Sequence, residues 1–87
     1  MLLLPGPGEW ALVWQVQGDT DGVWIDYDLK YACDLEERYR GDGQTFKRTP
    51  GNNIEFSYDV KQMSQHNHKY HTRRVMRRVM IKLQDLR

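Results

Sequence analysis

The sequence predicts a small α+β domain in which one amphipathic helix packs on a sheet. Residues 54–60 alternate apolar and polar side chains without a break, which is the period of a half-buried strand rather than a helix. Residues 29–40 carry apolar side chains at helical spacing instead. Since a helix and a sheet must each bury an apolar face, we expect the helix to lie on the sheet. The strand side chains expected to face the core are Ile54, Phe56, Tyr58 and Val60.

Length and charge narrow the classes of function. A chain of 87 residues allows one domain and leaves little room for a deep catalytic cleft. Residues 1–68 contain 6 Lys or Arg against 11 Asp or Glu, whereas residues 69–87 contain 7 against 1, so the two parts carry charges of −5 and +6. This asymmetry indicates either an anionic partner for the C-terminal part or a solvated charged face.

A hairpin is expected before the helix. Residues 11–17 and 23–27 are rich in β-branched and aromatic side chains, and a Gly- and Asp-rich turn at 18–22 separates them. Asp28 is placed to cap the helix at its N-terminus, and Gly41 is placed to end it. The apolar stripe of this helix consists of Ala32, Leu35 and Tyr39.

The C-terminal part is ambiguous. Residues 44–48 are typical of a short strand and residues 49–53 of a turn, while residues 61–68, after the alternating strand, are expected to form a polar loop. From residue 74 onward, periodicity alone indicates a basic amphipathic helix, and a basic strand is the alternative. The apolar residues at helical spacing are Val75, Met76, Val79, Met80, Leu83 and Leu86.

The N-terminal residues 1–8 are expected to be a disordered lead-in or linker, because Gly6-Pro7-Gly8 favours a flexible chain. The apolar start lacks the basic residues and the length of a signal peptide, and no apolar run approaches a membrane span. Cys33 is the only cysteine. No internal disulfide can form, so we expect an intracellular protein.

An ordered set of aromatic, acidic and basic residues runs through most of the chain. Beside Trp14, Trp24 and Glu36 it comprises Tyr27, Leu35, Tyr39, Gly51, Phe56, Asp59, Met63, Gln65, Asn67, Arg74, Arg77 and Arg78. Together these residues resemble the WWE domain, whose two name-giving tryptophans and glutamate would be Trp14, Trp24 and Glu36. The similarity spans residues 10–79.

The resemblance implies a strongly bent antiparallel sheet, a half-barrel, packed around one α-helix, with a strand rather than a helix through Arg78. The domain would occupy residues 9–80, and residues 81–87 would be a C-terminal tail or linker. WWE domains occur in ADP-ribosyltransferases and ubiquitin ligases. We therefore expect a monomeric module of a larger nuclear or cytoplasmic protein, without a cofactor.

The resemblance also implies a non-catalytic module that recognises terminal ADP-ribose or the iso-ADP-ribose unit of poly(ADP-ribose). Arg74 falls on the position of the phosphate-contacting arginine, and a guanidinium fork matches phosphate oxygens. Gln65 matches the ligand-contacting glutamine, whose amide offers a donor and an acceptor. Where polymer-binding members often carry a tyrosine, this chain has Phe56, which keeps the aromatic ring and lacks the hydroxyl. At two further positions that are aromatic in such members it has Ile25 and Val16, and the three side chains would form an apolar wall for adenine.

A protein- or RNA-interaction module that has lost ADP-ribose recognition is the alternative. Its basic face would consist of Arg73, Arg74, Arg77, Arg78 and Lys82. RNA is poorly supported as a partner, because single-stranded RNA stacks on exposed aromatics and Tyr70 is the only loop aromatic near the basic run.

Enzymes and metal sites are not expected. The sequence contains no spacing typical of a nucleophile with its base, of paired catalytic carboxylates or of a phosphate-binding Gly-rich loop. His66, His68 and His71 lack a clear fourth ligand, so we expect no metal site. Protonation of these histidines near pH 6 is instead expected to strengthen anion binding, because they lie beside the arginines in the sequence.

Overall fold

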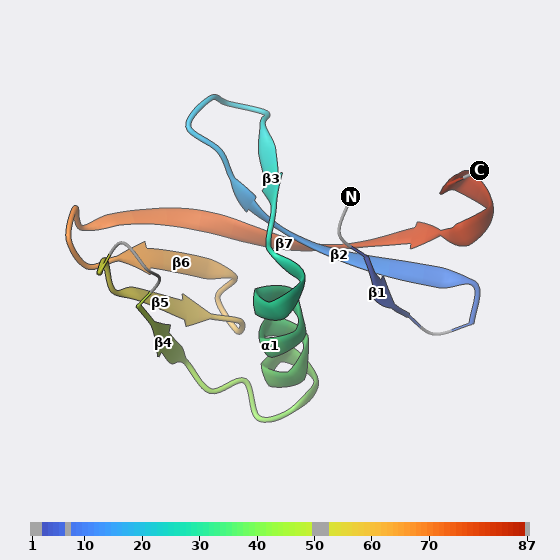
Figure 1. Cartoon of the computed structure of the whole chain (residues 1–87), viewed down its shortest axis with the longest axis horizontal. Coiled ribbons are helices and arrows are strands. Elements are labelled where there is room, and N and C mark those ends of the chain that lie inside the picture. Colours follow the sequence, from blue (N-terminus) through green and yellow to red (C-terminus); the bar gives the residue numbers. More distant parts are fainter. Residues whose placement is uncertain (1–2, 7, 50–52, 87) are drawn as a thin grey trace.

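The computed structural model describes residues 3–6, 8–49 and 53–86. It shows an α+β fold in which a strongly curled antiparallel sheet forms a half-barrel beside one helix (Figure 1). The predicted fold class is therefore confirmed. In chain order the elements are β1 (Leu4–Pro5), β2 (Trp10–Gln17), β3 (Trp24–Asp26), α1 (Leu29–Arg40), β4 (Phe46–Arg48), β5 (Phe56–Asp59), β6 (Ser64–Asn67), β7 (Thr72–Lys82) and the 3-10 helix η1 (Leu83–Leu86).

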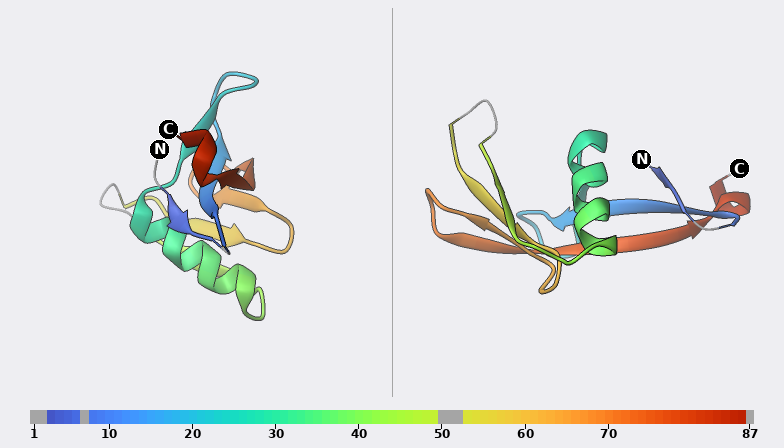
Figure 2. Two further views of the ribbon diagram at one scale, coloured as in Figure 1. Left: turned by 90° about the vertical axis from the view of Figure 1, so that its right-hand side faces the viewer. Right: turned by 90° about the horizontal axis from the view of Figure 1, so that it is seen from below.

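The long strand β7 joins the two parts of the sheet. The strand order is β1-β2-β7-β6-β5-β4. β3 is not part of this order and pairs only with β2 among the described strands. β7 pairs with β2 from Met76 to Lys82 and with β6 from Thr72 to Val75. Figure 2 shows β4 and β5 running across the direction of β2 and β7. One strand shared by two ladders, together with the natural twist of strands, thus produces the curvature.

The helix α1 has the bounds predicted from the sequence. The Asp28 carboxylate accepts a hydrogen bond of 3.0 Å from the Leu29 N–H, which caps the N-terminus. At the other end the Gly41 N–H donates to the Glu37 carbonyl at 3.0 Å. Gly43, with a φ of +72°, then turns the chain toward β4.

The core lies between α1 and the concave face of the sheet. Ala32 and Leu35 of the predicted helix stripe are buried, and they pack with Leu12, Trp14, Val16, Tyr58, Val60 and Met76. Tyr39, the third residue of the stripe, is 46% exposed. Its ring nevertheless forms a T-shaped contact with the Trp14 ring, with 5.7 Å between the ring centroids.

A buried carboxylate ties the helix to the sheet. Glu36 is 7% exposed, and its carboxylate accepts hydrogen bonds from Trp14 Nε1 at 2.8 Å and from Arg78 Nε and Nη2 at 2.8 and 3.0 Å. Arg40 also pairs with it from the next helical turn. Burial alone would raise the pKa of Glu36, but the hydrogen bonds from Arg78, Trp14 and Arg40 outweigh it and lower the pKa to about 2.

Three segments differ from the elements that residue patterns predict. Residues 64–67, expected in a polar loop, form β6 between β5 and β7. The helix that periodicity indicates after residue 74 is wrong, because β7 runs as a strand to Lys82 before the short helix η1 begins. Within the expected disordered lead-in, Leu4 and Pro5 pair with β2, and Leu4 is buried.

Several sequence expectations fall outside the described residues. These are the placement of residues 1–2 and 7 in the lead-in, of residues 50–52 in the turn before β5, and of residue 87 in the tail. In the described part of the chain, no helix combines the length and apolarity needed to cross a membrane.

Candidate ligand-binding site

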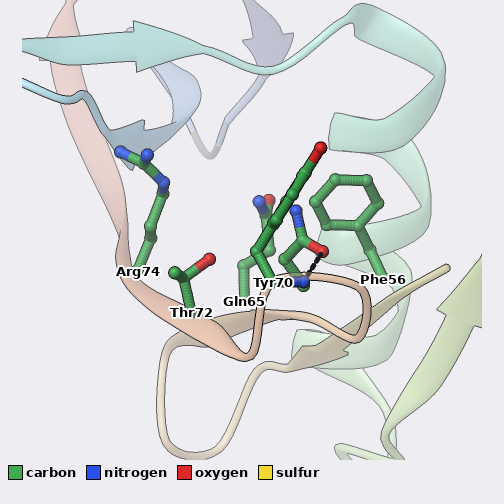
Figure 3. A pocket seen from close by; sticks show the side chains of 6 residues that line it. Phe56, Gln65, Tyr70, Thr72 and Arg74 are labelled. Atoms are coloured by element: carbon green, nitrogen blue, oxygen red, sulfur yellow. Dashed lines mark hydrogen bonds between the residues drawn. The ribbon is translucent and has the colours of Figure 1, made fainter. Parts of the chain in front are cut away.

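A pocket of about 320 Å³ opens on the concave face where β5, β6 and β7 meet (Figure 3). This volume is at the lower end of the range for small-molecule sites. Figure 3 shows the Arg74 guanidinium on one side, the Phe56 ring on the other and the Tyr70 ring between them. The lining residues are Phe56, Gln65, Asn67, Tyr70, Thr72 and Arg74.

Strand pairing explains why these side chains converge. Phe56 pairs with Asn67 and Asn67 with Thr72, which places one row of side chains across three strands. Gln65 pairs with Arg74 in the next row on the same face. Because side chains two residues apart on a strand share a face, the two rows together form the floor and one wall of the pocket.

Gln65 is oriented by a buried tyrosine. The Tyr27 hydroxyl donates to Gln65 Oε1 at 2.6 Å. Burial, with a further contribution from Tyr58, raises the pKa of Tyr27, so the hydroxyl stays protonated and remains a donor. Since this bond engages the amide oxygen, the NH2 group is the part of Gln65 that can donate to a ligand.

Arg74 reaches from β7 to the loop after β2. Its Nη1 donates to the Gln17 carbonyl at 3.2 Å, and its Nη2 pairs with Asp19. The Asp19 side chain is 89% exposed and that of Arg74 is 35% exposed. An ion pair this accessible to water contributes at most about 1 kcal/mol, so a phosphate group can replace the carboxylate at the guanidinium.

The five residues expected at the site separate into two groups. Phe56, Gln65 and Arg74 line one pocket. Val16 is buried in the core, where it pairs with Met76 of β7. Ile25 pairs with Val16 from the neighbouring strand but is 52% exposed and does not line this pocket. The structure therefore brings the aromatic, amide and guanidinium groups together without the two aliphatic residues.

Three lining residues were not assigned to the site from the sequence: Asn67, Tyr70 and Thr72. Asn67 shapes the β6–β7 hairpin, since its Oδ1 accepts hydrogen bonds from the Lys69 and Tyr70 N–H groups at 2.9 and 3.1 Å. Its spacing of two residues from Gln65 would have placed it in the site had β6 been recognised as a strand.

The basic run in β7 does not form one face. Arg74 points into the pocket, and Arg78 contacts Glu36 in the core with only 18% of its side chain exposed. Arg73 and Arg77 alternate with them and lie on the convex face, where the Arg77 guanidinium covers the Trp24 ring at 4.2 Å. The prediction that these arginines share one basic face is therefore wrong, because β7 directs two of them to each side of the sheet.

The three histidines gather at the β6–β7 hairpin, on the side of β6 away from Gln65. The His66 and His68 rings stack with centroids 4.6 Å apart, and His71 lies 6.4 Å from His66. Desolvation and the positive charges of His68, Arg73 and His71 lower the pKa of His66. Among the described residues, no group of three or more His, Cys, Asp or Glu is arranged to hold a metal ion.

Comparison with known protein families shows which family the chain resembles. The family model described as the WWE domain matches residues 12–78, which is more than half of the chain. The match includes all six residues that line the pocket, the helix α1, and Trp14 and Trp24. A search of curated proteins finds no match.

Proposed function

Because the chain belongs to the WWE family, a family of non-catalytic modules that bind ADP-ribose-related ligands, we propose that it recognises one ADP-ribose unit in the pocket on β5, β6 and β7. The observation that carries this proposal is the convergence of Phe56, Gln65 and Arg74 on one cavity of about 320 Å³. Each of these side chains suits a different part of such a unit.

The diphosphate is assigned to Arg74. A guanidinium offers parallel N–H donors to two phosphate oxygens, and such charge-assisted pairs are about twice as strong as neutral hydrogen bonds. The Gln17 carbonyl already holds one side of the group. A bound diphosphate would take the place of the exposed Asp19 carboxylate, so this part of the site is preorganised for an anion.

The nucleoside is assigned to the opposite side of the pocket. Phe56 and Tyr70 supply aromatic surface for a purine face. The NH2 group of Gln65, fixed through Tyr27, can donate to a purine edge or a ribose hydroxyl. The same residues suit a terminal ADP-ribose and the iso-ADP-ribose unit inside the polymer. The protein carrying this module is proposed to be an intracellular ADP-ribosyltransferase or ubiquitin ligase.

Calorimetric titration with iso-ADP-ribose, ADP-ribose and ATP tests the proposal. Arg74→Ala should weaken binding of the preferred ADP-ribose ligand roughly 10- to 100-fold, because it removes hydrogen bonds to a charged group. Gln65→Ala should weaken it roughly 3- to 10-fold, the range for a neutral hydrogen bond. Arg73→Ala, which removes the same charge one residue away on the opposite face of β7, is the matched control.

The outcomes separate specific recognition from general attraction. Specific recognition predicts that Arg73→Ala changes the affinity less than twofold and that ATP binds more weakly than the ADP-ribose ligands. Equal losses for Arg73→Ala and Arg74→Ala, or equal binding of ATP, would contradict it. Such a result, with a steep salt dependence, would favour the alternative of a general polyanion-binding module.

A further inference from the structure

Two arginines line a second cavity, on the side of the sheet that faces α1. The cavity measures about 460 Å³, and its walls include Arg40 at the C-terminal end of α1, Arg78 of β7, and Pro5 and Gly6. Figure 1 shows α1 between β1 and the strands β4, β5 and β6. Arg78 is four residues along β7 from Arg74, roughly 13 Å at the usual rise of a strand. This cavity is therefore separate from the pocket on β5, β6 and β7.

One carboxylate holds both guanidinium groups. Glu36 accepts hydrogen bonds from Arg78 Nε at 2.8 Å and Nη2 at 3.0 Å, and it pairs with Arg40 Nε. In the described part of the chain, neither arginine pairs with a second carboxylate, so two positive charges face one negative charge and leave an excess of +1. The Arg40 Nη groups and Arg78 Nη1 donate to no other described residue. These donors can therefore bind an anion in the cavity.

An apolar cavity adjoins this arginine pair. It measures about 400 Å³ and shares Pro5 and Gly6 with the first cavity. Its other described walls are Leu3, Leu4, Gly8, Trp10, Ala11 and Leu83. No acidic residue is among the described residues that line either cavity. A ligand that reaches both cavities therefore needs a negative group beside an apolar one.

We infer that the two cavities bind a protein segment in which an aspartate or glutamate stands next to a leucine or another aliphatic residue. The carboxylate would lie at Arg40 and Arg78, where its single charge matches the excess of +1. A phosphate monoester suits this place less well, because its charge of about −1.5 to −2 would also meet the Glu36 carboxylate. The aliphatic side chain would bury apolar surface in the adjoining cavity. This site does not depend on ADP-ribose binding.

Nuclear magnetic resonance titration of the isotope-labelled chain with short capped peptides tests this site. The probe Ser-Leu-Glu-Leu-Ser carries leucine on both sides of the acidic residue. Saturable shifts are expected at the Nε–H signals of Arg40 and Arg78, the Gly6 N–H and the Trp10 indole N–H. Ser-Leu-Gln-Leu-Ser lacks the charge and Ser-Gly-Glu-Gly-Ser lacks the apolar side chains, so each should bind at least roughly threefold more weakly.

Matched variants test the charged part of the site. Arg40→Ala should weaken binding of the glutamate peptide roughly 3- to 10-fold, because it removes one charged contact. Glu36 keeps Trp14 and Arg78 as partners in this variant, so the fold should be retained, which a melting curve verifies. The control Arg38→Ala removes the same charge from the same helical turn and should change the affinity less than twofold, since this guanidinium lies over the Phe46 ring.

A second pair of variants tests the apolar part. Leu83 and Leu29 are each 44% exposed, but of the two only Leu83 lines the apolar cavity. Leu83→Ala should therefore weaken the glutamate peptide roughly threefold, whereas Leu29→Ala should leave its affinity unchanged. Equal affinities for these two variants would overturn the apolar part of the site and with it the choice of a peptide ligand.

Four further results would overturn the inference. The first is the absence of saturable shifts at the two arginine signals, and the second is equal loss of affinity in Arg38→Ala and Arg40→Ala. The third is a shift of the same signals by inorganic phosphate or ADP-ribose at lower concentration than by the peptide, which would make this a phosphate site. The fourth is loss of peptide binding in Arg74→Ala, which would place the peptide in the pocket on β5, β6 and β7 instead.

Discussion

Replacement of Glu36 by glutamine should strongly destabilise the domain. The pKa of this carboxyl is about 2, compared with 4.5 for an ordinary glutamate. A depression of this size corresponds to about 3 kcal/mol of stability at pH 7. Removing one partner of a buried ion pair costs a similar amount, about 3–5 kcal/mol, because Arg78 would keep its charge without a carboxylate. For a domain of this size the melting temperature should fall by roughly 10–20 °C.

Urea unfolding followed by tryptophan fluorescence measures this effect, since Trp14 is fully buried. The exposed neighbour Glu37 provides the control, and Glu37→Gln should change the free energy of unfolding by less than about 0.5 kcal/mol. A loss below about 1 kcal/mol for Glu36→Gln would refute the account of the buried pair.

The pH dependence of the free energy of unfolding tests the same explanation. A lowered pKa in the folded state means that the stabilisation is complete above pH 4.5 and is lost as the pH falls toward 2. The stability difference between the unmodified chain and Glu36→Gln should therefore shrink by about 1 kcal/mol between pH 7 and pH 3.5. A difference that stays constant over this range would show that the charge of Glu36 is not its source.

Three further changes test the pocket. Asp19→Asn should tighten ADP-ribose binding roughly two- to fivefold, because the phosphate would no longer compete with a carboxylate for Arg74; weaker binding in titration would refute this competition. Tyr27→Phe should weaken binding severalfold by releasing the amide of Gln65, whereas an unchanged affinity would show that the ligand orients this amide without help. Phe56→Tyr adds a hydroxyl to the wall of the pocket and should strengthen binding roughly 2- to 10-fold through one new hydrogen bond; an unchanged affinity would show that the ligand has no partner for a hydroxyl at this position.

Residue patterns predict the helix and the strands that have one apolar face. Asp28 and Gly41 mark the ends of α1, and the alternation of residues 54–60 correctly predicts that Tyr58 and Val60 are buried. These elements are recognisable because one side of each packs on the core and the other faces water.

β6 could not be found in this way. Its sequence Ser64-Gln65-His66-Asn67 is polar on both faces, because one face lines the pocket and the other lies on the convex surface. β7 was ambiguous for a related reason. Arg74 stands at an inward position where a core strand would carry an apolar residue, so the apolar side chains that remain fall by coincidence at helical spacing.

The candidate site required more than periodicity. Gln65 and Arg74 were assigned through the family resemblance, and their meeting in one row depends on pairing between β6 and β7. Tyr70 enters the pocket through a turn in which His71 adopts a positive φ, a conformation that non-glycine residues seldom adopt. The role of Tyr27 behind Gln65 follows from a contact between residues 38 positions apart, which no local pattern specifies.

The arrangement of the two ends of the domain affects how it can be joined to other proteins. The Leu83 N–H donates to the Glu9 carbonyl at 2.8 Å, so β1 and η1 lie at the same end of the long ladder of β2 and β7 (Figure 1). Arg74 is eight residues along β7 from Lys82, a distance of roughly 25 Å at the usual rise of a strand. A fluorescent label, surface tether or fusion partner attached at either end would thus leave the pocket on β5, β6 and β7 open to solvent.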